Sequence, residues 1–290
     1  MNNKSIIPYS RIDEEKVIFP SNEESAIIEN YLGQIDKFHT LVRSFHINNF
    51  NFHQILYHFT MHADDTLIRT NGLPSDDFIV INTLLINYLS TSKMFVDIVE
   101  NFDKSLYDDI HSFISDKYDS SFYYQLMTEL RNFSLHGHLP VYYNDGRYSF
   151  NLHYILEEGK KYNLNKARKK KFKEISQQIR ENHNDIANIS FSITLIEYHK
   201  VIIEVFEHFF VIYTPDFSKK YCNFRKIIDK YNENEKDNSA CVYLDDSLHI
   251  LNTSNSMIET LNKEHSNAIE ILNVHIKNFK ELIKNNVCPQ

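Results

Sequence analysis

Four side chains between positions 131 and 138 have the chemistry needed for acid–base work on a phosphate ester. Arg131 and Asn132 come first, and His136 and His138 follow on either side of Gly137. An imidazole titrates near neutral pH, so it can take a proton from a 2′-hydroxyl or deliver one to a leaving oxygen. A guanidinium forks onto phosphate oxygens that gain negative charge in the transition state. These groups could cleave RNA through its own 2′-hydroxyl, without a metal ion.

The pattern around this cluster predicts the end of a helix. Apolar residues recur on a rough helical face before it: Phe122, Leu126, Leu130 and Phe133. Gly137 and Pro140 then supply a stop signal. His136 would lie in the last turn, where the negative end of the helix dipole favours a protonated imidazole, whereas His138 would lie in the exit loop. Arg131 precedes His136 by about 7–8 Å at about 1.5 Å per residue. The two can reach a common anion if their side chains bend toward it, or if a symmetric partner helps to enclose it.

The spacing Arg131-Asn132-x-x-x-His136 resembles the ribonuclease motif of the HEPN family, in which arginine and a polar residue precede a histidine. The Leu-Pro-Val that follows is similar to a subgroup of bacterial HEPN-like proteins. The resemblance covers residues 120–141, and the helical layout of 22–141 is compatible with it. It implies a metal-independent endoribonuclease that needs no cofactor and leaves a 2′,3′-cyclic phosphate. Such enzymes commonly form homodimers in which two motifs face one cleft, and many are toxins or antiviral effectors.

Transferred to this chain, the resemblance implies that Arg131 binds the scissile phosphate, His136 is the acid/base and Asn132 orients the site. Gly137-His138 departs from the subgroup, which more often has a second polar residue and then glycine here. Because His138 also fits the spacing, it stays open as a helper or substitute. We expect a cytoplasmic toxin or anti-phage effector that cuts single-stranded RNA or a tRNA loop, with an antitoxin or a defence-system protein as a candidate partner. The alternative is a catalytically silent helical module that binds RNA or a protein.

A basic segment at 166–173 is the candidate RNA-binding surface, with Arg168, Lys169, Lys170 and Lys171 at its centre. Its cations could track a phosphate backbone and hold RNA near the cleft. They cannot all face one way on a helix, so a solvated helix that balances an acidic protein is the slightly favoured alternative.

Composition limits the classes of partner and site. The formal charge of the 290-residue chain is −8, so an RNA site must be a local basic patch rather than the whole surface. Cys222, Cys241 and Cys288 are far apart, which indicates neither a zinc knuckle nor a disulfide framework and fits a reducing cytosol. His58 and His62 have the spacing of a metal-binding pair, but they lack the glutamate of an HExxH motif and lie in an aromatic-rich segment, so no metal is expected. The longest apolar runs are interrupted by polar residues and look too short to span a bilayer.

These residues require a mainly α fold, and we expect a helical bundle of the HEPN type with one or two small β hairpins. Two regions are expected: a motif-bearing region at 1–141, and 142–290 as its helical continuation or an accessory region. The expected elements are an irregular arm at 1–20, a further aromatic-rich segment at 50–62, helices at 21–46, 76–113, 119–136, 163–183, 189–213, 215–231 and from 256, and hairpins near 141–150 and 241–251.

Overall fold

A computed structural model describes residues 5–8, 21–62, 76–135, 138–144, 147–150, 152, 155, 157, 170, 173–175, 177, 189–231, 239–244, 247–252, 270 and 277. Among the predicted site residues, Arg131, Asn132, His138 and Lys170 lie within these ranges. His136, Arg168, Lys169 and Lys171 lie outside them.

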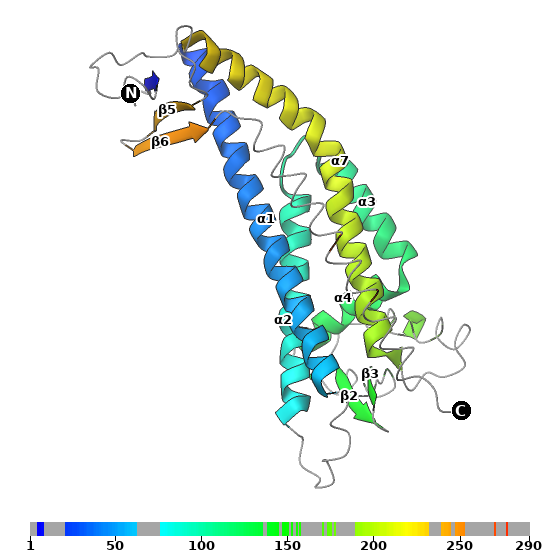
Figure 1. The fold of residues 1–290 in the computed structure, drawn as a ribbon. Coiled ribbons are helices and arrows are strands. Elements are labelled where there is room, and N and C mark those ends of the chain that lie inside the picture. Colours follow the sequence, from blue (N-terminus) through cyan, green and yellow to red (C-terminus); the bar gives the residue numbers. More distant parts are fainter. Residues whose placement is uncertain are drawn as a thin grey trace. The chain divides into compact units, whose positions relative to one another are not determined.

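The described chain is mainly α-helical, which confirms the predicted fold class (Figure 1). The helices are α1 (Asn22–His62), α2 (Asp76–Glu100), α3 (Tyr107–Ser120), α4 (Phe122–Ser134) and α7 (Phe191–Tyr231). One antiparallel sheet has the order β1-β5-β6, formed by Ser5–Pro8, Ser239–Leu244 and Ser247–Asn252. The other has the order β2-β3-β4, formed by Val141–Asn144, Arg147–Phe150 and Ile189–Ser190. Both predicted hairpins are therefore present, as β2–β3 and β5–β6.

The chain divides into two compact units. The first joins residues 1–40 to residues 210–290, and the second consists of residues 41–209. The predicted boundary at residue 141 lies inside the second unit. Arg131 and the other predicted site residues all belong to the second unit.

Stacked aromatic rings hold the first unit together. The Tyr31 ring stacks on Phe224 with the centroids 4.2 Å apart and on Phe217 at 5.8 Å. Phe38 stacks on Tyr213 with nearly parallel rings, 6.1 Å apart. All of these rings are buried, and large aromatic areas removed from water dominate the stability of such a core.

Aromatic packing also joins the helices of the second unit. Phe45 of α1 stacks on Phe206 of α7 with the centroids 4.4 Å apart. Phe52 stacks on the His199 ring at 3.8 Å, and the Tyr88 hydroxyl of α2 lies 2.9 Å from His199 Nδ1. His199 is thus a buried histidine whose Nδ1 is hydrogen-bonded, in the centre of the core.

Helix α1 runs without interruption through 46–50, where the sequence predicted a break. Polar side chains in this stretch reach across to α2. The Asn48 amide donates to Ser92 Oγ at 2.6 Å, and the Asn51 amide donates to Thr91 Oγ1 at 3.1 Å. These asparagines therefore do not compete for the backbone of α1, which is the usual reason that asparagine disfavours helices.

The predicted helix at 76–113 is interrupted, and this prediction was wrong. Helix α2 ends at Glu100 and α3 begins at Tyr107. Between them, Asp103 Oδ1 accepts hydrogen bonds from the backbone N–H of Ser105 at 2.9 Å and from its hydroxyl at 2.8 Å. This aspartate-centred turn offers the backbone an alternative to the helix.

Helix α7 is continuous across Pro215, although the sequence predicted separate helices at 189–213 and 215–231. The residues on either side, Tyr213 and Phe217, are fully buried one helical turn apart. Their burial offsets the hydrogen bond that proline removes.

The expectation of a wholly irregular N-terminal arm at 1–20 was also wrong. Strand β1 lies within this arm and pairs antiparallel with β5.

One described helix resembles a membrane span by length and composition. The stretch Phe78–Glu100 of α2 is long enough and apolar enough to cross a membrane, and 44% of its most apolar part is buried inside the protein. The sequence suggested that the apolar run starting at residue 78 is too short and too polar to span a bilayer. By length and composition this expectation was wrong, because the apolar helix continues to Glu100. Buried core helices of soluble proteins pass the same test.

Candidate functional site

The motif lies at the C-terminal end of α4, in the second unit. Helix α4 is separated from α3 by Ser121, which has an extended backbone and whose hydroxyl accepts from Tyr124 N–H at 3.3 Å. Serine at this position is a strong helix start, so the single predicted helix at 119–136 is instead the end of α3 followed by α4. After Ser134, Leu135 N–H donates to the Arg131 carbonyl at 3.0 Å, which forms the last turn.

Arg131 and Asn132 are adjacent and partly exposed in this last turn. The Nε atom of Arg131 is buried, and no hydrogen-bond partner for it exists among the described residues. No ion pair with a carboxylate engages the guanidinium in this part of the chain either. An arginine at a helix end without a carboxylate partner is suited to bind an external anion.

Tyr198 of α7 lies within electrostatic range of Arg131. Tyr124, two helical turns before Arg131 and on the same face of α4, stacks on the Tyr198 ring with the centroids 5.5 Å apart. Burial raises the pKa of the Tyr198 hydroxyl, while a hydrogen bond with Ser92 and the positive charge of Arg131 act in the opposite direction. The arginine is therefore close enough to act electrostatically on this phenol.

A buried carboxylate also lies on α4, and the sequence analysis did not single it out. Glu129 is nearly inaccessible to solvent, and its Oε1 accepts from the Tyr118 hydroxyl at 3.4 Å. Burial and then the charge of Glu129 raise the pKa of Tyr118 to about 12. Glu129 precedes Arg131 by two residues, so the two side chains leave the helix on different faces. Its local signal, one acidic residue between Thr128 and Leu130, was too weak to identify it.

His138 packs against Phe133 of α4. Its ring stacks on Phe133, with the centroids 4.5 Å apart and the planes at 23°. Phe133 is fully buried and leaves the helix about 200° around the axis from Arg131, at about 100° per residue. The structure therefore associates His138 with the core side of α4. His136 lies outside the described residues, so its position relative to Arg131 stays a prediction.

The chain that leaves the motif is fixed by Asn82 of α2. Val141 N–H donates to Asn82 Oδ1 at 2.9 Å, and Asn82 Nδ2 donates to the Val141 carbonyl at 3.1 Å. Between the helix end and Val141, Leu135 and Leu139 are exposed apolar side chains. No sequence pattern links positions 82 and 141, so this contact could not be foreseen.

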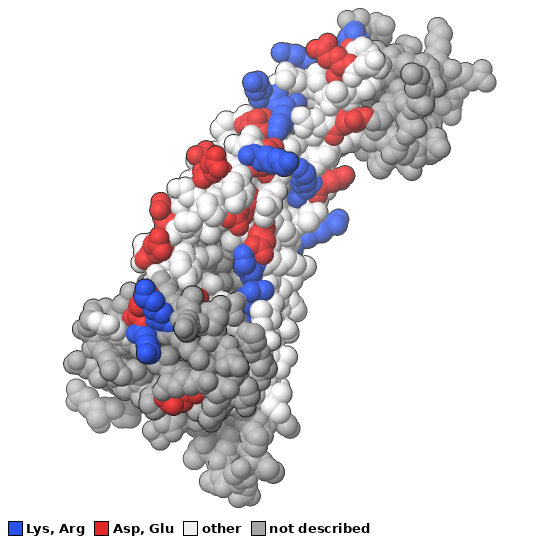
Figure 2. All heavy atoms as spheres, turned by 180° about the vertical axis from the view of Figure 1, so that it is seen from behind, with Lys and Arg blue, Asp and Glu red and all other residues white. Residues whose placement is uncertain are grey.

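The predicted RNA-binding segment is represented by Lys170. Lys170 is exposed and lies 3.7 Å from Glu174, one turn away on the same face. An exposed pair of this kind is weak, and its cation stays accessible to a phosphate. On the face shown in Figure 2, the described basic and acidic side chains are interspersed.

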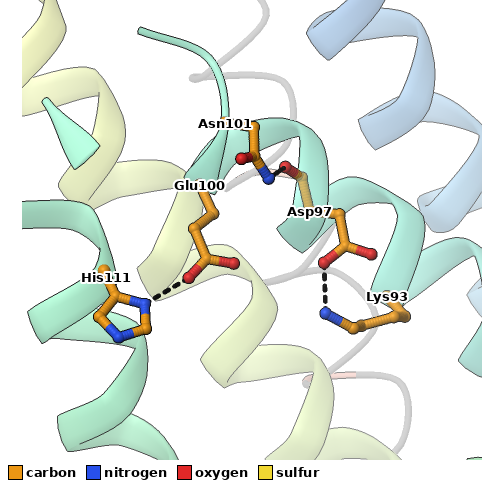
Figure 3. Close-up of polar contacts among 5 residues, drawn as sticks. All are labelled: Lys93, Asp97, Glu100, Asn101 and His111. Carbon is orange, nitrogen blue, oxygen red and sulfur yellow. Dashed lines mark hydrogen bonds and ion pairs between the residues drawn. The ribbon is translucent and has the colours of Figure 1, made fainter. Parts of the chain in front are cut away.

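A second polar cluster joins the end of α2 to α3 (Figure 3). Glu100 Oε1 lies 2.5 Å from His111 Nδ1, and Lys93 pairs with Asp97 along α2. Tyr107 stacks on His111 from the same helix. Glu100 and His111 are paired with each other at the surface, which fits a bridge between two helices better than a reactive centre.

No group of three or more histidine, cysteine, aspartate or glutamate side chains is arranged to hold a metal ion in the described part of the chain. His58 lies in that part and is partly buried, whereas the His62 side chain is outside it. No protein-family model, curated protein or solved structure matches this chain.

Proposed function

We propose that this protein is a metal-independent endoribonuclease of the HEPN type that acts as a bacterial toxin or an anti-phage defence effector. The proposed substrate is single-stranded RNA or a tRNA loop, because a flexible backbone can align its 2′-hydroxyl with the scissile phosphate. The active form is proposed to be a homodimer. The family and the biological role rest on the motif at residues 131–136.

One structural observation supports the proposal most directly. Arg131 stands at the end of α4, partly exposed, with a buried Nε that has no hydrogen-bond partner among the described residues. A partly exposed guanidinium without a carboxylate partner gains a counter-charge when it binds an external phosphate. A helix end that served only structure would be expected to pair its arginine internally.

In the proposed mechanism, His136 takes the proton from the 2′-hydroxyl, whose oxygen then attacks the adjacent phosphorus. The phosphorus–5′-oxygen bond breaks, and a protonated histidine delivers a proton to that leaving oxygen. The products are a 2′,3′-cyclic phosphate and a free 5′-hydroxyl. Arg131 stabilises the charge on the phosphate oxygens, and Asn132 orients them. A second motif from a dimer partner would supply the second histidine.

The proposal is tested with purified protein and RNA in the presence of EDTA. Cleavage that persists in EDTA, yields cyclic phosphate ends and is lost in both Arg131→Ala and His136→Ala supports the enzyme. Arg43→Ala is the matched control, since Arg43 is an exposed arginine of the same unit, remote from the motif in sequence. Equal background cleavage in the wild type and all three variants would refute the activity.

A silent binding module is the second candidate, and one observation favours it. Ile47, Phe50 and Tyr57 of α1 are large apolar side chains that are exposed on one face of the helix. Exposed apolar surface of this kind marks interaction sites. In that case the protein would bind RNA or a partner with the same affinity in the wild type and in His136→Ala, and neither would cleave.

A further inference from the structure

We infer that Asn82 is a positioning residue of the proposed ribonuclease site: it fixes the chain that leaves the motif and thereby holds His138 on Phe133. The inference rests on the proposed function for its catalytic consequence. The positioning itself rests on three hydrogen bonds of Asn82 and on the burial of Asn82 and Val141, which are independent of any activity.

The Asn82 carboxamide is buried, and both its oxygen and its nitrogen form hydrogen bonds. Its Oδ1 accepts from Val141 N–H at 2.9 Å, and its Nδ2 donates to the carbonyls of Val141 at 3.1 Å and Phe78 at 2.9 Å. Both Asn82 and Val141 are inaccessible to solvent. Each bond therefore forms where water cannot replace it, and the loss of one would leave a buried group unsatisfied.

Asn82 takes the place of a neighbouring strand. In an antiparallel sheet the N–H and C=O of one residue point to the same side. Val141 is opposite Phe150 of β3, and both of its backbone groups bond to Asn82 instead. Since β2 is at the edge of its sheet, the carboxamide satisfies an edge position that would otherwise be open.

The histidine of the exit loop lies between two fixed points. Leu135 N–H is bonded to Arg131 in the last turn of α4, and Val141 is held by Asn82. The His138 ring stacks on the buried Phe133. Release of Val141 would free one end of this short segment, so His138 would lose its fixed place and the spacing to Arg131 would vary.

The first test measures position without activity. In the wild type, the ring current of Phe133 should displace the NMR signals of the His138 ring. Asn82→Ala is expected to abolish this displacement, whereas Asn49→Ala is expected to retain it. Asn49 is the matched control because it is a buried asparagine of the same unit, 7% exposed, with no partner for its Oδ1 among the described residues. Unchanged His138 signals in Asn82→Ala would overturn the inference.

The second test uses Asn82→Asp and the pH dependence of cleavage. A carboxylate lacks the two N–H donors and repels the Val141 carbonyl. The segment between Leu135 and Val141 that it releases carries the proposed acid/base His136 as well as His138, so kcat should fall, on the order of 100-fold for a displaced catalytic group. A protonated carboxyl has one donor and one acceptor and can remake both bonds to Val141. The ratio of variant to wild-type kcat should therefore rise as the pH falls, and it should not do so for Asn49→Asp.

The outcomes separate the two proposals. A wild type without ribonuclease activity refutes the proposed function, while the NMR comparison still decides the role of Asn82. An active wild type with identical pH-dependent ratios for Asn82→Asp and Asn49→Asp refutes the positioning role. If Asn82→Ala does not fold, the His138 signals of Asn82→Asp at acidic and neutral pH provide the same comparison.

Discussion

At the scale of single residues, the structure describes one of the two histidines that the sequence left open. His138 stacks on the buried Phe133, on a different side of α4 from Arg131. We therefore expect His138→Ala to retain cleavage within a few-fold of the wild type, whereas His136→Ala should lose the 10²–10⁴-fold that acid–base catalysis typically contributes. Initial rates on one labelled RNA, with each variant's folded fraction checked by circular dichroism, provide the measurement. Loss of activity in His138→Ala beside an active His136→Ala would reverse the assignment.

Buried tyrosines make stability depend on alkaline pH. Burial and then the charge of Tyr221 raise the pKa of Tyr31 to about 12, from about 10 in an unfolded chain. A raised pKa in the folded state means that this contribution to stability is complete below pH 10 and is lost as the pH rises towards 12. The free energy of unfolding should fall by up to about 1.4 kcal/mol per pH unit for such a group in this window.

Urea titrations at pH 9 to 12 would check this dependence. Tyr31→Phe removes the hydroxyl but keeps the stacked ring, so its free energy of unfolding should fall less steeply with pH than that of the wild type. Tyr57→Phe is a suitable control because Tyr57 is 61% exposed. Equal slopes in all three proteins would contradict the assignment to Tyr31.

At the scale of elements, the start of α1 is fixed by a reciprocal cap. Ser21 Oγ accepts from Glu24 N–H at 3.2 Å, and Glu24 Oε2 accepts from Ser21 N–H at 2.8 Å. Ser21→Ala removes the acceptor of one bond and should cost about 1 kcal/mol. Amide hydrogen exchange at the first turn of α1 should accelerate accordingly, while exchange in α4 stays unchanged. Uniform acceleration through both helices would show that the cap acts on global stability instead.

Helix α1 also shows which features of the fold can be predicted from neighbouring residues in the sequence. The helix start expected near residue 21 and the hairpin expected near 141–150 are both present, because residues close together in the sequence determine each of them. The continuity of α1 through Asn48 depends on Ser92 of another helix. The Asn82–Val141 contact likewise joins positions far apart in sequence. Local patterns thus located Arg131 at a helix end but could not show what surrounds it.

At the scale of the whole molecule, the second unit has a face without formal charge. No lysine, arginine, aspartate or glutamate occurs at 44–62 of α1 or at 78–92 of α2, and these helices are joined by the bond between Asn48 and Ser92. The exposed apolar side chains of this uncharged face are Ile47, Phe50, Tyr57, Ile79 and Val80. The face lacks the lysine and arginine cations that attract RNA and anionic lipids, and its exposed apolar side chains fit an uncharged protein surface.

A second copy of the chain offers such a surface, because a two-fold axis pairs a patch with itself. The proposed homodimer therefore leads us to expect that Phe50→Glu, which places like charges across the axis, weakens association at least tenfold. Val211→Glu is the control, since Val211 is an apolar residue of the first unit that is 70% exposed, against 61% for Phe50. Sedimentation equilibrium over a range of concentrations would measure both. A monomeric wild type would refute the homodimer. A dimeric wild type with equal dissociation constants for both variants would place the interface elsewhere, and the uncharged face would then have to serve a different protein.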